Sequence, residues 1–294
     1  MIEFRTPTFF TQYNLASKDR VIKFMSRLLI AASGTGGHIY PALALADSLP
    51  KSWEIEWLGV PDRMEIELVP KKYNLTILKV GGLQGNIFKK MFEFFKLVFA
   101  SIQVSSILRK KKIDVIFTTG GYISAPSIIG AKLMGIPILL HESNAIPGKV
   151  SRFFGRFCGH VALGIPSSSK YLPRCKKSFT GTPVRSEFYL EQPLPHWVPS
   201  GQGILIVIMG GSQGAMKMNK MVRLALPLLL DNDCRIVHLT GKNDQFYRNL
   251  ESFKTHPNLV VRHFSNEIPA LLQNADLAIS RAGSGAICEL MVTK

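Results

Sequence analysis

The sequence predicts an α/β protein built from two doubly wound, Rossmann-like halves. Short apolar runs alternate with helical patterns from residue 27 onward, which is typical of parallel strands buried on both faces. Each half opens with such a run and then a glycine-rich turn, first at Gly34–Gly37 and again at Gly210–Gly214. A proline-rich stretch, 192–199, separates the halves. We therefore expect a ligand site in the cleft between the two sheets, at the carboxyl ends of the strands.

The composition narrows the class of protein. At 294 residues the chain can form two domains, and 46% hydrophobic with 19% charged residues is typical of a soluble globular protein. The net charge of +16 favours an anionic partner, such as nucleic acid, an acidic membrane surface or a phosphorylated substrate. The four cysteines are scattered, with no paired spacing, so neither a disulfide framework nor a metal site is expected. Neither a membrane-spanning run nor a secretory signal is recognisable.

The pattern assigns elements to the first half in a regular order. Expected strands are 28–32, 54–58, 75–80, 114–118 and 136–140, and expected helices are 41–49, 63–69, 87–112 and 125–134. Pro41 is expected to open its helix as the first residue, where its missing N–H costs nothing.

The second half continues the alternation but is shorter. Expected strands are 203–209, 235–239, 259–261 and 277–279, with helices after the second glycine turn and at 287–292. The chain stops soon after that last helix, so we expect a second domain truncated at its C-terminal end. The predicted boundaries are a disordered extension at 1–26, a first domain at 27–184, a linker at 185–202 and a second domain at 203–294. Met25 is expected to be the natural start.

The first glycine turn is suited to a phosphate. A strand, a glycine turn and a helix start together aim backbone N–H groups and the positive end of a helix at one spot. A dinucleotide fingerprint would need a third glycine where Ile39 stands, and no P-loop lysine follows. On these residues alone, a tight turn without a ligand fits equally well. His38 places a titratable side chain at the helix start.

Four further motifs follow strands or turns where a ligand could approach. They are TTGGYISAP at Thr118–Pro126, HESNAIPGK at His141–Lys149, GTPVR at Gly181–Arg185 and SRAGSGAICE at Ser280–Glu289. Together with GTGGH and GGSQGA, they resemble the bacterial N-acetylglucosaminyltransferases that convert lipid I to lipid II in peptidoglycan synthesis. The resemblance runs from about Arg27 to the end of the chain, with the motifs in the right order. It implies the two-domain GT-B fold, the donor UDP-N-acetylglucosamine (UDP-GlcNAc), the acceptor lipid I, and transfer without a metal or other cofactor.

The resemblance also implies roles for individual residues. The first domain would carry the acceptor and membrane side, and the second the UDP-sugar side. The donor contacts would come from Thr35, Gly36 and Gly37 in the first turn, Asn144 at the sugar, Arg185 and Ser212 at the phosphates, Glu289 at the ribose and the backbone of Ser265 at the uracil. His38 would be the general base of an inverting transfer, with Glu142 as its rival.

Each of these roles has a plain structural alternative. His38 could make only a backbone hydrogen bond, Glu289 could be a solvated helix residue, and Arg185 could form only a salt bridge at the domain junction. The whole chain could also be a non-catalytic fragment that keeps nucleotide or membrane binding.

The segment 85–112 predicts contact with an anionic membrane surface. It holds too many apolar residues for one core-facing stripe, and lysines flank them. The predicted membrane contacts are Ile87, Phe88, Lys89, Lys90 and Phe92, although some of these apolar side chains could instead fill the core. A peripheral position on the cytoplasmic face of the cell membrane follows, with cell-wall synthesis and division proteins as further partners. No nucleic-acid module is recognisable, so nucleic acid is not an expected partner.

Overall fold

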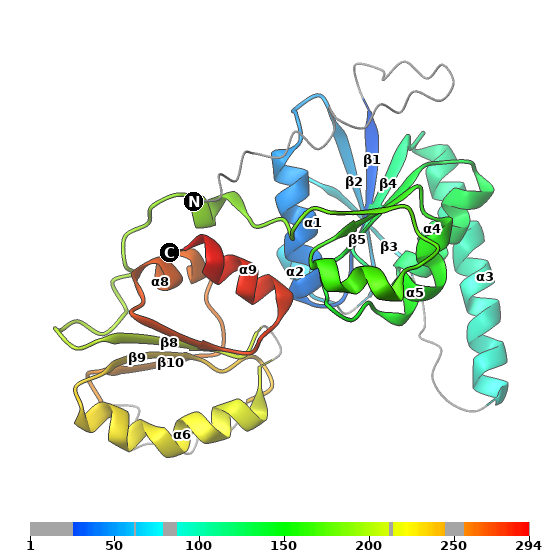
Figure 1. Cartoon of the computed structure of the whole chain (residues 1–294). Coiled ribbons are helices and arrows are strands. Elements are labelled where there is room, and N and C mark those ends of the chain that lie inside the picture. Colours follow the sequence, from blue (N-terminus) through cyan, green and yellow to red (C-terminus); the bar gives the residue numbers. More distant parts are fainter. Residues whose placement is uncertain (1–25, 62, 79–86, 212–213, 245–255, 294) are drawn as a thin grey trace.

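The computed structural model describes residues 26–61, 63–78, 87–211, 214–244 and 256–293, with only the backbone at 87–93. These residues form two α/β units, each built on a parallel sheet (Figure 1). The first sheet has seven strands in the order β3-β2-β1-β4-β5-β6-β7, and the second has four in the order β10-β9-β8-β11. Every described pairing is parallel, as the buried apolar runs predicted. The predicted α/β fold class is therefore confirmed.

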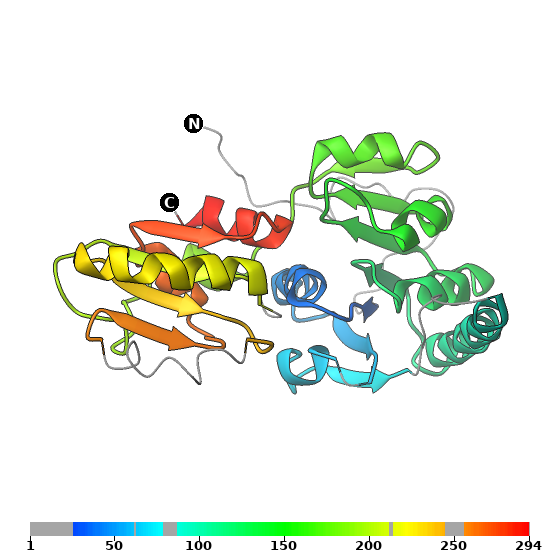
Figure 2. The same cartoon turned by 90° about the horizontal axis from the view of Figure 1, so that it is seen from below.

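The first unit alternates strands and helices around β1. Its strands are β1 (Arg27–Ala31), β2 (Glu54–Gly59), β3 (Asn74–Ile77), β4 (Val115–Thr118), β5 (Ile138–Glu142), β6 (His160–Leu163) and β7 (Lys177–Phe179). Its helices are α1 (Gly36–Ser48), α2 (Glu65–Leu68), α3 (Ile87–Lys110), α4 (Ser124–Leu133) and α5 (Lys149–Phe154), with 3-10 turns at Gly155–Phe157 and Pro166–Tyr171. Helices cover both faces of this sheet (Figure 2), so its central strands are apolar along their whole length.

The second unit repeats the plan on a smaller scale. Its elements are the 3-10 turn Ser186–Tyr189, β8 (Leu205–Met209), α6 (Met216–Asp231), β9 (Arg235–Leu239), β10 (Leu259–Arg262), α8 (Ile268–Asn274), β11 (Leu277–Ser280) and α9 (Ser284–Val292). All five residues of β8 are buried. Helix α6 covers one face of the sheet, and α8 and α9 lie on the other (Figure 1).

Two differences from the sequence prediction have physical causes. Helix α1 begins at Gly36, so Pro41 lies inside it and the prediction that Pro41 opens the helix was wrong. Thr35 caps the helix instead, because its carbonyl accepts the N–H groups of His38 and Ile39. The short elements β6, β7 and α5 were missed because they are small and flanked by basic residues, which weakens any apolar period.

The strand orders explain where a ligand can bind. In each sheet the first strands are added on one side of the opening strand and the later ones on its other side. The order therefore reverses between β1 and β4 in the first sheet and between β8 and β11 in the second. Loops after these strands part there and leave a crevice at the carboxyl ends. The two glycine turns follow β1 and β8 and therefore open into the two crevices. Among the described residues, no helix is long and apolar enough to cross a membrane.

Candidate functional site

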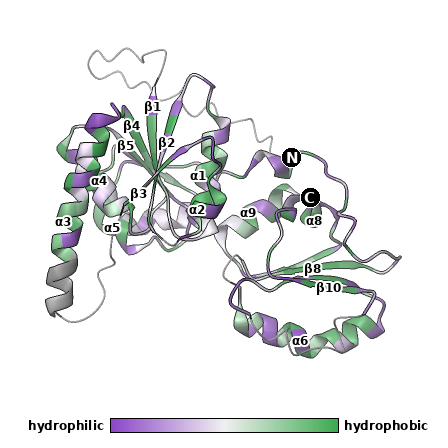
Figure 3. Cartoon of the chain, turned by 180° about the vertical axis from the view of Figure 1, so that it is seen from behind, coloured by the Kyte–Doolittle hydropathy of each residue, from purple (hydrophilic) through white to green (hydrophobic). Residues whose placement is uncertain are grey.

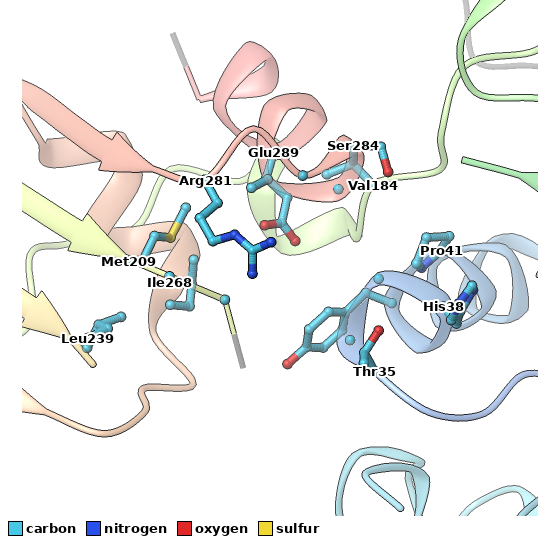
Figure 4. A pocket seen from close by; sticks show the side chains of 18 of the residues that line it. Thr35, His38, Pro41, Val184, Met209, Leu239, Ile268, Arg281, Ser284 and Glu289 are labelled. Carbon is cyan, nitrogen blue, oxygen red and sulfur yellow. The ribbon is translucent and has the colours of Figure 1, made fainter. Parts of the chain in front are cut away.

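A cavity of about 470 Å³ lies between the two units. Residues of α1 form one side, and residues of α9 and of the loops after β8, β10 and β11 form the other (Figure 4). Seven residues with predicted roles line it: Thr35, Gly36, Gly37, His38, Asn144, Arg185 and Glu289. The expected cleft between the two sheets is therefore present, and it gathers motifs from 35 to 289.

His38 is held in one tautomer by a backbone carbonyl. Its Nδ1 atom lies 2.7 Å from the carbonyl oxygen of Thr119. A carbonyl only accepts, so Nδ1 must carry a proton and a neutral ring keeps its lone pair on Nε2. The ring lies against the turn of Gly120 and Gly121, whose positive φ angles of 94° and 83° favour glycine. The backbone hydrogen bond that the sequence analysis gave as the alternative role of His38 is thus present. It leaves the Nε2 atom free to accept a proton.

A buried carboxylate that the sequence reasoning missed fixes the first glycine turn. The side chain of Glu65, on α2, is fully buried and accepts a hydrogen bond from the Ser33 hydroxyl at 2.5 Å and from the Gly34 N–H at 3.2 Å. It also accepts the Val60 N–H at 2.7 Å. A Cβ at Gly59 would lie 2.8 Å from the Glu65 side chain, so glycine is required there. An acidic residue is normally expected at the surface, and only its neighbours in space show this role.

Glu142 holds a loop rather than facing the cavity. Its carboxylate accepts the backbone N–H and the side-chain amide of Asn144, at 3.0 and 2.9 Å, and the N–H of Gly148 at 3.2 Å. The side chain is 3% exposed and is not part of the cavity lining. These contacts orient Asn144, which does line the cavity. Of the two candidate bases, His38 therefore lines the cavity and Glu142 does not.

His141, which precedes this pair, is buried and neutral. Burial lowers the pKa of His141, and the nearby His38 acts in the same direction, while the Gly181 carbonyl and Glu142 act against them. Its Nε2 donates to the Gly181 carbonyl at 3.0 Å, and its Nδ1 accepts from the Ser143 hydroxyl at 3.2 Å. The ring thereby ties the end of β5 to the loop that leads to Arg185.

Arg185 bridges the two sides of the cavity. Its guanidinium lies 4.2 Å from the ring centre of Tyr40 on α1 and 5.1 Å from that of Phe188. Its Nη2 lies 3.8 Å from a carboxylate oxygen of Glu289 on α9, and both side chains are 17% exposed. Glu289 is therefore not a solvated helix residue. Burial raises the pKa of Glu289, and Arg185 opposes that effect.

The second glycine turn rests on a buried polar network. Asn219 of α6 donates to the Thr240 carbonyl at 2.9 Å and to Asp244 at 2.6 Å, and Arg223 pairs with Asp244 at 2.9 Å. A Cβ at Gly214 would lie 2.3 Å from the same Thr240 carbonyl, so the turn and the network are in direct contact. The Nε2–H group of His238 donates to the side-chain oxygen of Asn219 at 3.2 Å, and burial lowers the pKa of His238 to about 4.

The predicted uracil contact lies next to the cavity. Ser265 is buried, and its hydroxyl accepts the Glu267 N–H, while its neighbours His263 and Phe264 line the cavity. Arg281, to which the sequence reasoning gave no role, also lines the cavity. Ser212 lies outside the described residues, as do residues 1–25 of the predicted extension. The side chains at 87–93, which include all five predicted membrane contacts, also lie outside the described part. Within the described ranges, no group of three metal-ligating side chains is found.

Comparison with known proteins decides the family. Residues 28–163 match the glycosyltransferase family 28 N-terminal domain, and residues 205–294 match its C-terminal domain. A UDP-N-acetylglucosamine–N-acetylmuramyl-(pentapeptide) pyrophosphoryl-undecaprenol N-acetylglucosamine transferase of Prochlorococcus marinus (strain NATL2A) is 75% identical over 270 residues, which are 92% of this chain and 77% of that protein. The protein of the same name from Synechococcus sp. (strain WH7803) is 56% identical over 92% of this chain and 74% of its own length. Acinetobacter baumannii MurG is similar in structure, with a TM-score of 0.64 at 28% identity over 90% of this chain and 76% of that one.

The chain belongs to the MurG family.

Membership makes this chain a UDP-sugar glycosyltransferase with the GT-B fold. The calicheamicin glycosyltransferase CalG4 shares the fold at 14% identity, with a TM-score of 0.57 over 90% of this chain and 76% of that one. The MurG-family motifs therefore meet in the geometry described above: His38 and the first turn on one wall, Arg185 and Glu289 on the other.

Proposed function

We propose that this chain transfers N-acetylglucosamine from UDP-GlcNAc to the C4 hydroxyl of the N-acetylmuramic acid of lipid I, forming lipid II with inversion at the anomeric carbon. The observation that carries the proposal is one cavity lined by both glycine turns and by His38, Arg185 and Glu289. The relatives named for this reaction support it.

In the proposed reaction, His38 is the general base. The acceptor hydroxyl attacks C1 of the sugar, the bond from C1 to the β-phosphate oxygen breaks, and the hydroxyl proton passes to Nε2 of His38. The hydrogen bond from Nδ1 to the Thr119 carbonyl keeps that lone pair available and steadies the imidazolium that forms. Glu142 acts through Asn144, which it orients, rather than on the proton itself.

The departing diphosphate gains negative charge, which the second wall neutralises. Arg185 supplies a fixed guanidinium, because it is stacked on Tyr40 and Phe188 and cannot swing away freely. The glycine turn before α6 adds backbone N–H groups and the positive end of that helix. Glu289 accepts hydrogen bonds from the ribose, and the backbone near Ser265 meets the uracil. In the proposed complex Thr35, Gly36 and Gly37, which line the cavity from the first unit, contact the donor from the opposite side.

We also propose that α3 and the end of α4 lie against the anionic inner face of the cell membrane. Within the described part of α3, the buried stripe is formed by Ala100, Val104 and Leu108, whereas the phenylalanines face solvent. The exposed apolar side chains are Phe94, Phe95, Phe99 and Ile102 on α3 and Leu133 and Met134 beside them on or just after α4. Figure 3 shows α3 at the outer edge of the first unit, with hydrophobic stretches along its described part. Such a surface suits an enzyme whose acceptor is linked to a membrane lipid. The expectation that division proteins are further partners stays a prediction.

A transfer assay tests the proposal directly. The chain is incubated with lipid I and UDP-GlcNAc carrying a radiolabelled sugar, and label in the lipid fraction is followed. We expect label to enter lipid II, and His38→Ala to abolish most of it. Binding of UDP without any transfer would instead favour the non-catalytic alternative, and absence of UDP binding would contradict the site.

A further inference from the structure

The outer face of α6 carries an apolar stripe with the spacing of a helix–helix seam. Met221, Leu224 and Leu228 are 71%, 76% and 68% exposed, although they belong to the same helix as the buried Val222, Leu226 and Leu230. Extending the stripe in both directions gives Lys217 and Asp231, both exposed. The five positions are separated by four, three, four and three residues, which is the repeat of the contact positions in a coiled coil. The buried Val222, Leu226 and Leu230 belong to the core cluster of the second unit, whereas none of the stripe residues lines the cavity. Figure 3 shows α6 on the opposite side of the second sheet from α9.

The charges at the ends of this seam oppose the dipole of their own helix. Lys217 stands in the first turn of α6, near its positive end, and Asp231 is the last residue, at its negative end. A helix is stabilised by acidic residues in its first turn and basic residues in its last turn, so Lys217 and Asp231 do not stabilise an isolated α6. Within the described residues neither side chain has an ion-pair partner. A partner that brings the opposite charge to each end would remove both unfavourable terms.

We propose that this seam is an interface between two copies of the chain, packed with their α6 helices antiparallel about a two-fold axis at Leu224. In that register Lys217 faces Asp231 of the second copy, Met221 faces Leu228, and Leu224 faces itself. The two-fold axis repeats the first two of these pairs with the copies exchanged, so the interface has five layers of facing residues, as an isologous interface requires. Both the end charges and the two helix dipoles are then paired favourably. The exposed Pro227 lies beside the central layer and adds apolar surface.

Charge favours a second copy over a membrane as the occupant of this seam. The seam carries one basic and one acidic side chain at its two ends, so an anionic lipid surface would attract Lys217 and repel Asp231. A second copy satisfies both at once. The contact is a single pair of 16-residue helices, which places it near the low end of the area of specific interfaces, roughly 1,000 Å². The dimer is therefore weak and forms in a concentration-dependent way.

Sedimentation velocity of the full chain, at about 1 to 100 µM, tests the interface. We expect the weight-average mass to rise from that of the 32.7 kDa monomer toward twice that value. Leu224→Glu should keep the chain monomeric throughout, because two carboxylates would meet on the axis. Leu133→Glu is the matched control: it changes an equally exposed leucine, 70% against 76%, on a different helix, and should dimerise like the parent chain. A parent chain that stays monomeric, or a Leu224→Glu chain that dimerises normally, overturns the proposal.

Charge reversal tests the antiparallel register. Lys217→Asp alone places two carboxylates together in each end layer, and Asp231→Lys alone places two ammonium groups there, so each should weaken dimerisation about tenfold or more. An equimolar mixture of the two variants restores opposite charges in both layers and should dimerise like the parent chain, as should the double variant. Failure of both to recover, with the single variants folded by circular dichroism, overturns this register.

Discussion

The Nδ1 atom of His38 donates a hydrogen bond to the carbonyl oxygen of Thr119 at 2.7 Å, which joins the first glycine turn to the loop after β4. The same bond decides which ring nitrogen can accept a proton. The first prediction concerns this atom.

Replacing His38 with alanine should lower kcat by about 10²–10⁴-fold, the usual contribution of a general base. Binding of UDP should change little, because Arg185, Glu289 and the segment around Ser265, to which we assign the phosphate, ribose and uracil contacts, are separate from His38. Turnover is measured with lipid I, and UDP binding by calorimetry. A variant that keeps full turnover would remove His38 from the mechanism.

Replacing Glu65 with glutamine should also lower kcat while leaving UDP affinity near normal. One amide oxygen can still accept from Ser33 and Val60, but the amide NH₂ then faces the N–H of Gly34, so the turn that leads to His38 shifts. Glu67→Gln is the control, since Glu67 lies on the same helix and makes only an exposed ion pair with Lys242. Equal losses of turnover, UDP binding and thermal stability in Glu65→Gln would indicate a purely structural role.

Glu289→Gln should weaken UDP binding by about 1–2 kcal/mol, since a charge-assisted hydrogen bond to the ribose becomes a neutral one. The same change should stabilise the unliganded chain at high pH. The pKa of Glu289 is raised in the folded state, so the parent chain loses stability as the pH rises through that raised value. Calorimetry with UDP and thermal unfolding at pH 5 and 8 give the two readouts. A glutamine chain with parental UDP affinity would place the ribose elsewhere.

The buried His238 should make the chain sensitive to acid. Its pKa is lowered to about 4 in the folded state, with Asp244 opposing and Arg223 reinforcing the effect of burial, whereas the unfolded chain binds a proton below about 6.5. Stability is therefore present above pH 6.5 and is lost as the pH falls toward 4, by roughly 3 kcal/mol at most from this residue. In urea unfolding, His238→Gln should lose less stability than the parent between pH 7 and 5. The exposed His196→Gln should behave as the parent does.

Vesicle sedimentation tests the membrane surface. Binding should require anionic lipid and fall with added salt, because the apolar side chains enter the headgroup region while basic residues meet acidic lipids. Phe95→Ser with Phe99→Ser should reduce it, since both rings are exposed. Leu190→Ser, which changes an exposed leucine of the second unit outside the proposed α6 seam, is the control and should bind as the parent does. Equal binding to neutral and anionic vesicles would contradict the proposal.

Much of the fold could be predicted from local pattern. The strand at 235–239 matches β9, and the runs at 28–32 and 203–209 correspond to β1 and β8, because a strand buried on both faces must be apolar throughout. The start of α1 could not be placed, because a proline is compatible with both the first turn and, at a cost, a later one.

The candidate site divides in the same way. Glycine turns and polar stretches that follow strands have a local signature, and the family resemblance implied the roles of His38, Asn144 and Glu289, which do line the cavity. Glu65 and Asn219 act through backbone groups that are distant in sequence, up to 32 residues away for Glu65 and Ser33. Nothing in the sequence near Glu65 shows that its carboxylate is buried. Such residues become visible only when the chain is folded.

The two walls of the cavity come from separate α/β units joined by one connecting segment, and each wall carries a different part of the task. The unit with α9 holds the residues that we assign to the ribose and uracil, and the unit with α1 and α3 holds the proposed base and the proposed lipid-facing surface. Exchange of the second unit for that of a related transferase should therefore change the sugar donor and leave the acceptor unchanged. The contact between Tyr40 and Arg185, where the two walls meet, would have to be kept.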